Sequence, residues 1–200
     1  MSETFKSQIK DLVDDLKAVF THVGLGGEAA EYKLLTQSFL YKFLNDKFLY
    51  QAKAIDASNS YEKLIDMSEE DYAWLLKFIG TRTAWLKPDQ LIETLHRQQN
   101  EPTFYETFEN TLNQIAIDNN DIFSVHTDGD TAIRLFDERL ITDTISDSSK
   151  RNEVAKSIIN LLARVKFDET IFSQGFDFFS TLFEYMIKDY NKDGGGKYAE

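Results

Sequence analysis

The chain has 200 residues, of which 42% are hydrophobic and 14% aromatic, which is enough for a buried core and excludes disorder throughout. It has no cysteine, so disulfide scaffolds, thiolate zinc sites and cysteine nucleophiles are excluded. The formal net charge is −12, which disfavours general binding to the nucleic-acid backbone, because that affinity comes from Lys and Arg.

The first quarter of the chain predicts two helices. Residues 7–20 place apolar side chains three and four positions apart, which indicates a helix with one buried stripe. Gly24, Gly26 and Gly27 end this helix, because glycine readily takes positive φ. Residues 28–54 predict a longer helix, whose wide apolar face indicates burial on more than one side. We expect this long helix to be central.

Helix start signals continue along the chain. Ser68 stands before three acidic residues, which is typical of an N-cap. Pro88 suits the first turn of a short helix over 89–97. Thr103, with a glutamate three positions later, has the spacing of a capping box. Helical spacing returns at 154–162.

The predicted fold class is all-α. The periodicity blurs around 117–147, where Asn, Asp and Gly mark loops and residues 122–125 predict a short extended pair. Residues 176–190 show the clearest apolar repeat of the chain. We therefore predict one compact multi-helix domain of about seven to nine helices over 1–190. It carries a small irregular or β-like insertion around 117–147, and residues 191–200 form a Gly-rich linker.

Few motifs in the sequence carry chemistry. It has neither a Walker-type phosphate loop nor the Gly-x-Ser-x-Gly turn of serine hydrolases. The three histidines are isolated, without another His or Cys at ligand spacing, and are interpreted as surface or packed residues. We therefore predict neither catalytic residues nor a metal site.

One segment nevertheless matches the calcium-loop pattern of EF-hands, at Asp189, Asn191, Asp193, Gly194 and Glu200. The match lacks an exiting helix, contains two further glycines that loosen the backbone, and has no partner loop elsewhere in the chain. We expect that added calcium leaves the melting temperature unchanged, because a filled site would raise it. An upward shift that Asp189→Ala abolishes would contradict this prediction.

The sequence predicts a cytoplasmic protein without membrane contact. No stretch approaches the roughly 20 apolar residues of a membrane helix. The N-terminal residues alternate in charge and lack the apolar core of a secretion signal.

The acidic charge is concentrated in the middle of the chain. Residues 32–97 hold nine Lys or Arg against nine Asp or Glu, whereas residues 101–147 hold two Arg against eleven Asp or Glu. A contact with DNA or a partner would therefore need a local basic edge on the long helix, with Lys33, Lys42, Lys47 and Lys53 as candidates. The alternative is that these are solvated lysines beside a buried stripe.

Two segments resemble a known protein family. Residues 31–48, EYKLLTQSFLYKFLNDKF, resemble the helix that opens the modification (M) subunit of type I restriction–modification systems. Residues 176–190, with the Gly-Gly-Lys-Tyr at 195–198, are similar to the helix and linker before the family's methyltransferase domain. Residues 133–167 resemble the family's weakly patterned middle. The resemblance spans nearly the whole chain, in the family's order.

The resemblance implies a subunit of an adenine-N6 DNA methyltransferase that uses S-adenosylmethionine. In this family two M subunits assemble with one specificity (S) subunit, and restriction (R) subunits join them. The catalytic domain of the M subunit carries a Gly-containing cofactor loop and an Asn-Pro-Pro-Phe/Tyr loop for the flipped adenine. Neither motif exists in this chain. The resemblance therefore implies an N-terminal assembly and DNA-clamp domain that is not catalytic by itself.

Glu200 matches the first residue of the family's cofactor-entrance segment, so the resemblance implies that a methyltransferase domain follows in the parent protein. S-adenosylmethionine is then expected for the full-length protein and not for these 200 residues, and DNA is expected to bind only in the full complex. The alternative is a stand-alone helical interaction module without a methyltransferase role. A continuation with Tyr-Thr-Pro and a later Asn-Pro-Pro-Phe/Tyr loop would favour the first hypothesis.

Overall fold

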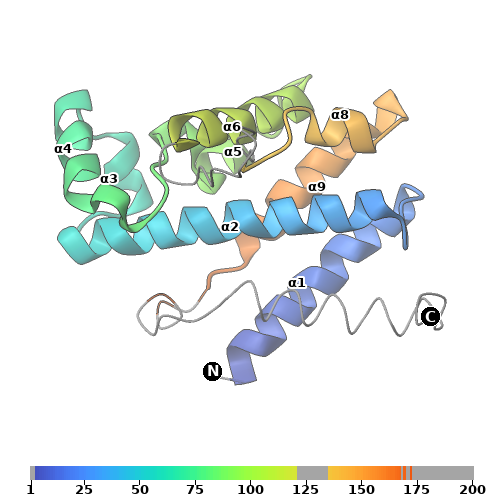
Figure 1. Cartoon of the computed structure of the whole chain (residues 1–200), viewed down its shortest axis with the longest axis horizontal. Helices are drawn as coiled ribbons and strands as arrows, with labels where there is room; N and C mark the ends of the chain where they lie inside the picture. Colours follow the sequence, from blue (N-terminus) through green and yellow to red (C-terminus); the bar gives the residue numbers. More distant parts are fainter. Residues whose placement is uncertain (1–2, 121–134, 168, 170–171, 173–200) are drawn as a thin grey trace, which may run out of the picture.

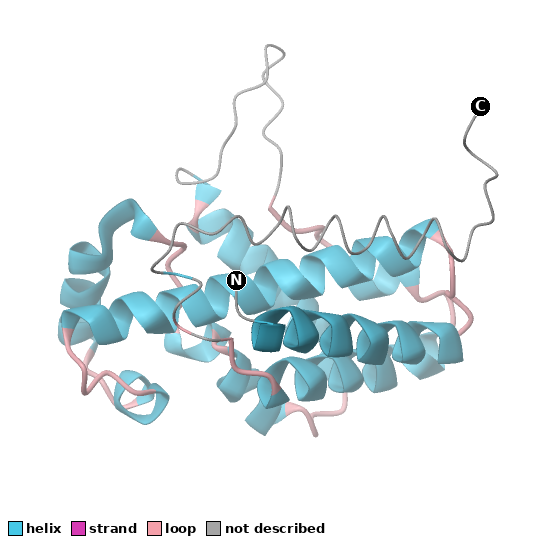
Figure 2. Cartoon of the chain, turned by 90° about the horizontal axis from the view of Figure 1, so that it is seen from below, coloured by secondary structure: helices cyan, strands magenta, loops and turns pink. Residues whose placement is uncertain are grey.

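The computed structural model describes residues 3–120 and 135–167, together with 169 and 172. Their helices are α1 (Glu3–His22), α2 (Ala29–Ile55), α3 (Tyr61–Ile65), α4 (Glu69–Ile79), α5 (Ile92–Gln98), α6 (Phe104–Asp118), α8 (Leu140–Thr144) and α9 (Arg151–Arg164). Single 3-10 turns occur at Gly80–Arg82, Pro88–Gln90 and Ser148–Lys150. Figure 2 shows helices and loops but no strand among these residues, which confirms the all-α prediction.

Several predictions fall outside the described residues. They are the extended pair at 122–125, the helix at 176–190, the calcium pattern over 189–200, the linker at 191–200, and Glu200. Among the described residues, no helix combines the length and the apolar character needed to cross a membrane.

Helix α2 runs through the centre of the fold, as the sequence predicts. In Figure 1 it extends across the molecule, with α1 on one side and α5, α6 and α8 on the other. It contacts α1, α4, α8 and α9 directly. Contacts on several sides require buried residues around much of its circumference, and these include Leu34, Leu35, Phe39, Tyr41, Leu44 and Phe48. The wide apolar face is therefore buried on more than one side, as predicted, because different neighbouring helices cover different parts of it.

The turn between α1 and α2 depends on glycine. Gly24 and Gly27 have φ angles of 89° and 76°, a region that other residues rarely adopt. The carboxylate of Glu31, in the first turn of α2, accepts a hydrogen bond from the Gly27 N–H at 2.7 Å. This bond satisfies one backbone donor next to the helix start.

Two predicted helix starts have different outcomes. Ser68 caps α4 as predicted, because its Oγ accepts a hydrogen bond from the Asp71 N–H at 3.1 Å. The capping box at Thr103 is wrong, because this side chain makes no capping bond. Instead, Asn152 of α9 accepts a hydrogen bond from the Tyr105 N–H at 3.0 Å, while Glu106 accepts one from the Tyr105 hydroxyl. A neighbouring helix thus satisfies one backbone donor in the first turn of α6.

The helix predicted over 89–97 begins later than expected. Pro88–Gln90 forms a 3-10 turn, and Leu91 is extended at φ −74° and ψ 142°. Asn45 of α2 supplies the cap, since its Oδ1 accepts a hydrogen bond from the Ile92 N–H at 3.0 Å. The start of α5 is therefore set by a side chain 47 positions earlier in the chain.

The range around 117–147 is partly helical where the structure describes it. Its first residues complete α6, and α8 occupies Leu140–Thr144. Both the N–H and the hydroxyl of Thr142 donate hydrogen bonds to the carboxylate of Glu109 on α6, at 2.6 and 2.9 Å. A helix of five residues carries too little periodicity to stand out in the sequence, and these contacts hold it in place.

Candidate functional site

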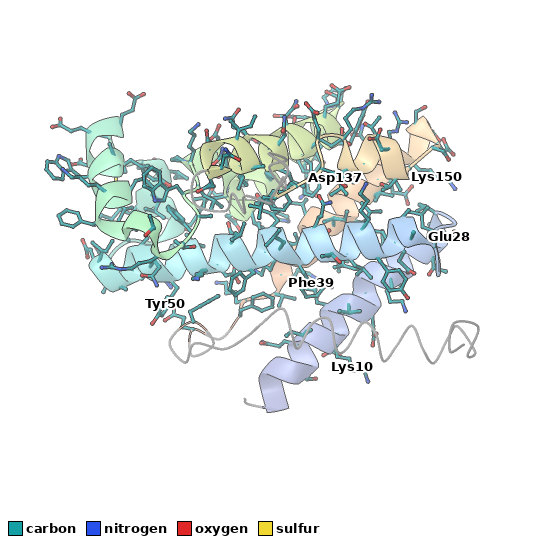
Figure 3. All side chains as sticks on the ribbon, viewed as in Figure 1. Lys10, Glu28, Phe39, Tyr50, Asp137 and Lys150 are labelled. Carbon is teal, nitrogen blue, oxygen red and sulfur yellow. The ribbon has the colours of Figure 1, made fainter. Side chains whose placement is uncertain are left out.

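The four candidate lysines of α2 do not form one basic edge. At 100° per residue, Lys42 and Lys53 lie on one side of the helix, and Lys33 and Lys47 lie on the other. Figure 3 shows Asp137, which contacts Lys33, above α2. The predicted DNA-facing or partner-facing surface is therefore split between two sides of α2.

Three of these lysines have exposed or partly exposed partners within the chain. The Lys33 ammonium lies 2.6 Å from the Asp137 carboxylate, and the Lys53 ammonium lies 3.1 Å from the Glu169 carboxylate. Lys47 lies over the ring of Phe43, with its Nζ 5.6 Å from the ring centroid. These contacts are exposed or partly exposed, so each is weak and a stronger ligand could displace it.

Lys42 corrects the prediction of an exposed basic edge. Its side chain is only 4% exposed, and its ammonium lies 2.9 Å from the Asp46 carboxylate and 5.5 Å from the centroid of the Phe167 ring. Burial lowers the pKa of Lys42, while the charge of Asp46 and its hydrogen bond act in the opposite direction. Asp46 also accepts hydrogen bonds from Asn45 and from the Phe167 N–H. Lys42 therefore belongs to the core of this side of α2.

A cavity of about 400 Å³ opens beside this buried pair, between α2, α3, α5 and the chain that follows α9. Its volume is in the range of small-ligand sites. Its cationic side chains are Lys42, Lys53 and Lys166, and its carboxylates are Asp46, Glu62, Glu93 and Glu169. Because the two signs nearly balance and the two innermost charges pair with each other, the cavity favours neither an anion nor a cation.

Two buried tyrosines next to α5 are structural. The Tyr41 hydroxyl donates a hydrogen bond to the Gln90 carbonyl, and the Tyr72 hydroxyl donates one to the Leu86 carbonyl, both at 2.6 Å. Burial, followed by the charge of Asp89, raises the pKa of both phenols well above the ordinary value. They stay neutral at every physiological pH and anchor residues 86–90 to α2 and α4.

Among the described residues, no three His, Asp or Glu side chains lie close enough together to hold a metal ion. His22 and His96 lie apart, on α1 and α5, and His126 is outside the described residues.

An exposed aromatic surface on α4 is the feature that sequence reasoning missed. Trp74 is 51% exposed and Phe78 is 61% exposed, and their rings stack with centroids 6.2 Å apart. The ammonium of Lys77 lies 5.0 Å from the centroid of the Trp74 ring. We call these three residues the α4 aromatic surface. Tyr72, Leu75 and Ile79 are buried on another side of the helix, so a helical projection could have revealed the exposed pair.

A second testable prediction concerns DNA. We expect that a gel-shift assay of the isolated chain with an arbitrary duplex detects no retention at physiological salt. The net charge is −12, and the α2 lysines are engaged with Asp137, Asp46, Glu169 and Phe43. Retention at nanomolar concentration that falls with added salt would contradict this expectation.

The described part of the chain thus offers a divided set of lysines, a cavity of mixed charge and one exposed aromatic surface. Compared with protein-family models, curated proteins and solved structures, the chain matches none.

Proposed function

We propose that this chain is the N-terminal assembly and DNA-clamp domain of the M subunit of a type I restriction–modification enzyme, and that it is not catalytic by itself. In this proposal its partners are an S subunit, a second M subunit and an R subunit, and it works in the cytoplasm. S-adenosylmethionine is the cofactor of the full-length protein.

The observation that carries the proposal is the position of residues 31–48. This segment has the resemblance to the family's opening helix, and it makes up most of α2. Leu34, Phe39 and Phe48 of the segment are fully buried. The residues of this signature lie on the helix that contacts α1, α4, α8 and α9. Changing them would disturb the packing of all four helices, so the signature is tied to the whole fold.

The same proposal assigns DNA contact to the full complex alone. The chain is strongly acidic, and among the described residues its α2 lysines already contact partners within the chain. A duplex enclosed between two M subunits and an S subunit would be held by their combined surfaces, so this domain needs only to close the enclosure.

The gene sequence beyond the Glu200 codon tests the proposal most directly. We expect an open reading frame that continues with Tyr-Thr-Pro and later encodes Asn-Pro-Pro-Phe or Asn-Pro-Pro-Tyr. A frame that continues without these motifs would contradict the M-subunit assignment.

Calorimetry with S-adenosylmethionine tests whether cofactor binding requires the methyltransferase domain. We expect no binding heat from the 200-residue chain and a stoichiometric heat from the protein extended through the cofactor loop, which serves as the positive control. Micromolar binding by the 200-residue chain alone would show that the proposed boundary of the cofactor domain is wrong.

The second candidate function is a stand-alone helical interaction module. The α4 aromatic surface favours it, since exposed Trp and Phe side chains held next to each other are typical of protein contact sites. A gene that lacks the methyltransferase motifs would leave this candidate as the better one.

A further inference from the structure

Helix α4 stands at one end of the molecule, where it is turned steeply away from the direction of α2 (Figure 1). Tyr72, Leu75 and Ile79 bury one side of α4 against the core. The opposite side carries Trp74 and Phe78, which are among the large apolar side chains that the described residues leave exposed. Burying such a pair against a partner would be favourable, because each aromatic side chain offers on the order of 150–250 Å² of contact area.

The charges on either side of this pair have opposite signs. Glu69, Glu70 and Asp71 form the first turn of α4, and Lys77 lies in its last turn. Arg82 follows the helix end, where its guanidinium donates a hydrogen bond to the Phe78 carbonyl at 3.4 Å. The described residues provide no ion-pair partner for Glu70 or Arg82, so both charges face solvent.

This arrangement is complementary to itself. When two α4 helices pack antiparallel about a two-fold axis at the level of residue 76, position 74 of one copy faces position 78 of the other. The acidic first turn of each copy then lies beside the C-terminal end of the other, where the Arg82 guanidinium is bound to the Phe78 carbonyl. Trp74 then packs on Phe78 of the second copy, and Glu70 comes near the Arg82 guanidinium at the C-terminal end of the other α4. Each contact occurs twice, as a two-fold interface requires. The antiparallel direction also brings the helix dipoles into a favourable arrangement.

We propose that the α4 aromatic surface is a self-association site, at which a second copy of this chain binds through an antiparallel α4–α4 contact. The inference rests on α4 alone and does not depend on the proposed function. The acidic first turn makes a nucleic-acid strand the less suitable occupant, because Glu70 lies one turn from Trp74 on the same side.

The interface is small, and the association is accordingly weak. The exposed area of Trp74, Phe78 and their charged neighbours is well below the roughly 800 Å² per partner of a standard interface. The two copies also repel each other through a charge of −12 each. We expect a monomer–dimer equilibrium with a dissociation constant on the order of 100 µM.

Sedimentation velocity of the full 200-residue chain tests the proposal, over a roughly hundredfold range of concentration around this value. The wild-type chain should shift from monomer to dimer, and the Trp74→Ala/Phe78→Ala variant should remain monomeric throughout. Ile117→Ala is the matched control, because Ile117 on α6 is as exposed as Trp74, at 51%. This control should associate like the wild type. Circular dichroism spectra should be the same for all three proteins, because the substituted side chains are exposed.

Charge reversal tests the antiparallel register separately. Glu70→Arg and Arg82→Glu should each weaken association on the order of tenfold, because each places like charges opposite one another in both halves of the dimer. The double variant, E70R with R82E, should restore the wild-type constant. Failure of the double variant to restore association would overturn the register.

Three outcomes would overturn the self-association site itself. They are a wild-type chain that stays monomeric over the whole range, a Trp74→Ala/Phe78→Ala variant that still dimerises, and an Ile117→Ala variant that loses association. Quenching of tryptophan fluorescence by a thymidine oligonucleotide, in a wild-type chain that stays monomeric, would instead assign the surface to single-stranded nucleic acid if the Trp74→Ala/Phe78→Ala variant shows no such quenching.

Discussion

Replacing Phe48 with alanine should destabilise the protein by about 3–5 kcal/mol, which is a large share of the roughly 5–15 kcal/mol that stabilises a typical domain. The Phe48 side chain is fully buried on α2, and its ring lies 6.4 Å from the ring of Tyr72 on α4. Alanine would leave a cavity at the junction of these two helices, because the surrounding side chains relax only in part. Urea denaturation of the two proteins measures the difference.

Phe78→Ala is the matched control for this prediction. It removes the same side chain from α4, but at a position that is 61% exposed. We expect a change within about 0.5 kcal/mol, measured at a concentration where the chain is monomeric. A loss of stability in Phe48→Ala no larger than that in Phe78→Ala would show that the α2–α4 junction does not contribute to the free energy of unfolding.

Replacing Asp46 with asparagine should destabilise the protein by about 3–5 kcal/mol near neutral pH. The substitution keeps the shape of the side chain but removes the charge that lies 2.9 Å from the buried Lys42 ammonium. An uncompensated buried cation is costly, because the interior cannot solvate it. Adding Lys42→Met to Asp46→Asn should recover most of this loss, since the double variant has no buried charge at this position. A double-mutant cycle in urea measures the coupling between the two residues.

The pH dependence of Asp46→Asn has a definite sign. Burial already lowers the pKa of Lys42 in the wild type, and losing the Asp46 charge lowers it further. Between this lowered pKa and the ordinary lysine value of about 10.4, the unfolded chain binds a proton that the folded chain does not. The stability of the variant therefore rises with pH through this window, relative to that of the Lys42→Met/Asp46→Asn variant. A difference that stays constant with pH would contradict the assignment of the effect to Lys42.

Local sequence signals were sufficient where they act over one helix. The bounds of α2 differ by one residue at each end from the predicted range 28–54, because a long run of apolar residues outweighs any local ambiguity. Ser68 could be recognised as a cap because its hydrogen bond to the Asp71 N–H spans only three residues.

Signals that depend on distant residues could not be obtained from the sequence. The start of α5 depends on Asn45, the first turn of α6 depends on Asn152, and the burial of Lys42 depends on Phe167. In each case the deciding partner is at least 47 positions away. A lysine beside an apolar stripe is usually solvated, and only the packed structure shows that Lys42 is not.

The central position of α2 determines how the domain unfolds. Helices α1, α4, α8 and α9 all pack on this one helix, so none of its central turns can unwind while the neighbours stay folded. Amide protons in the middle of α2 should therefore exchange with deuterium only through global unfolding, whereas those of the five-residue α3 and α8 should exchange through local opening. Slow exchange would then be concentrated in residues 34–48, and the domain would behave as a single cooperative unit whose last protected segment is its central helix.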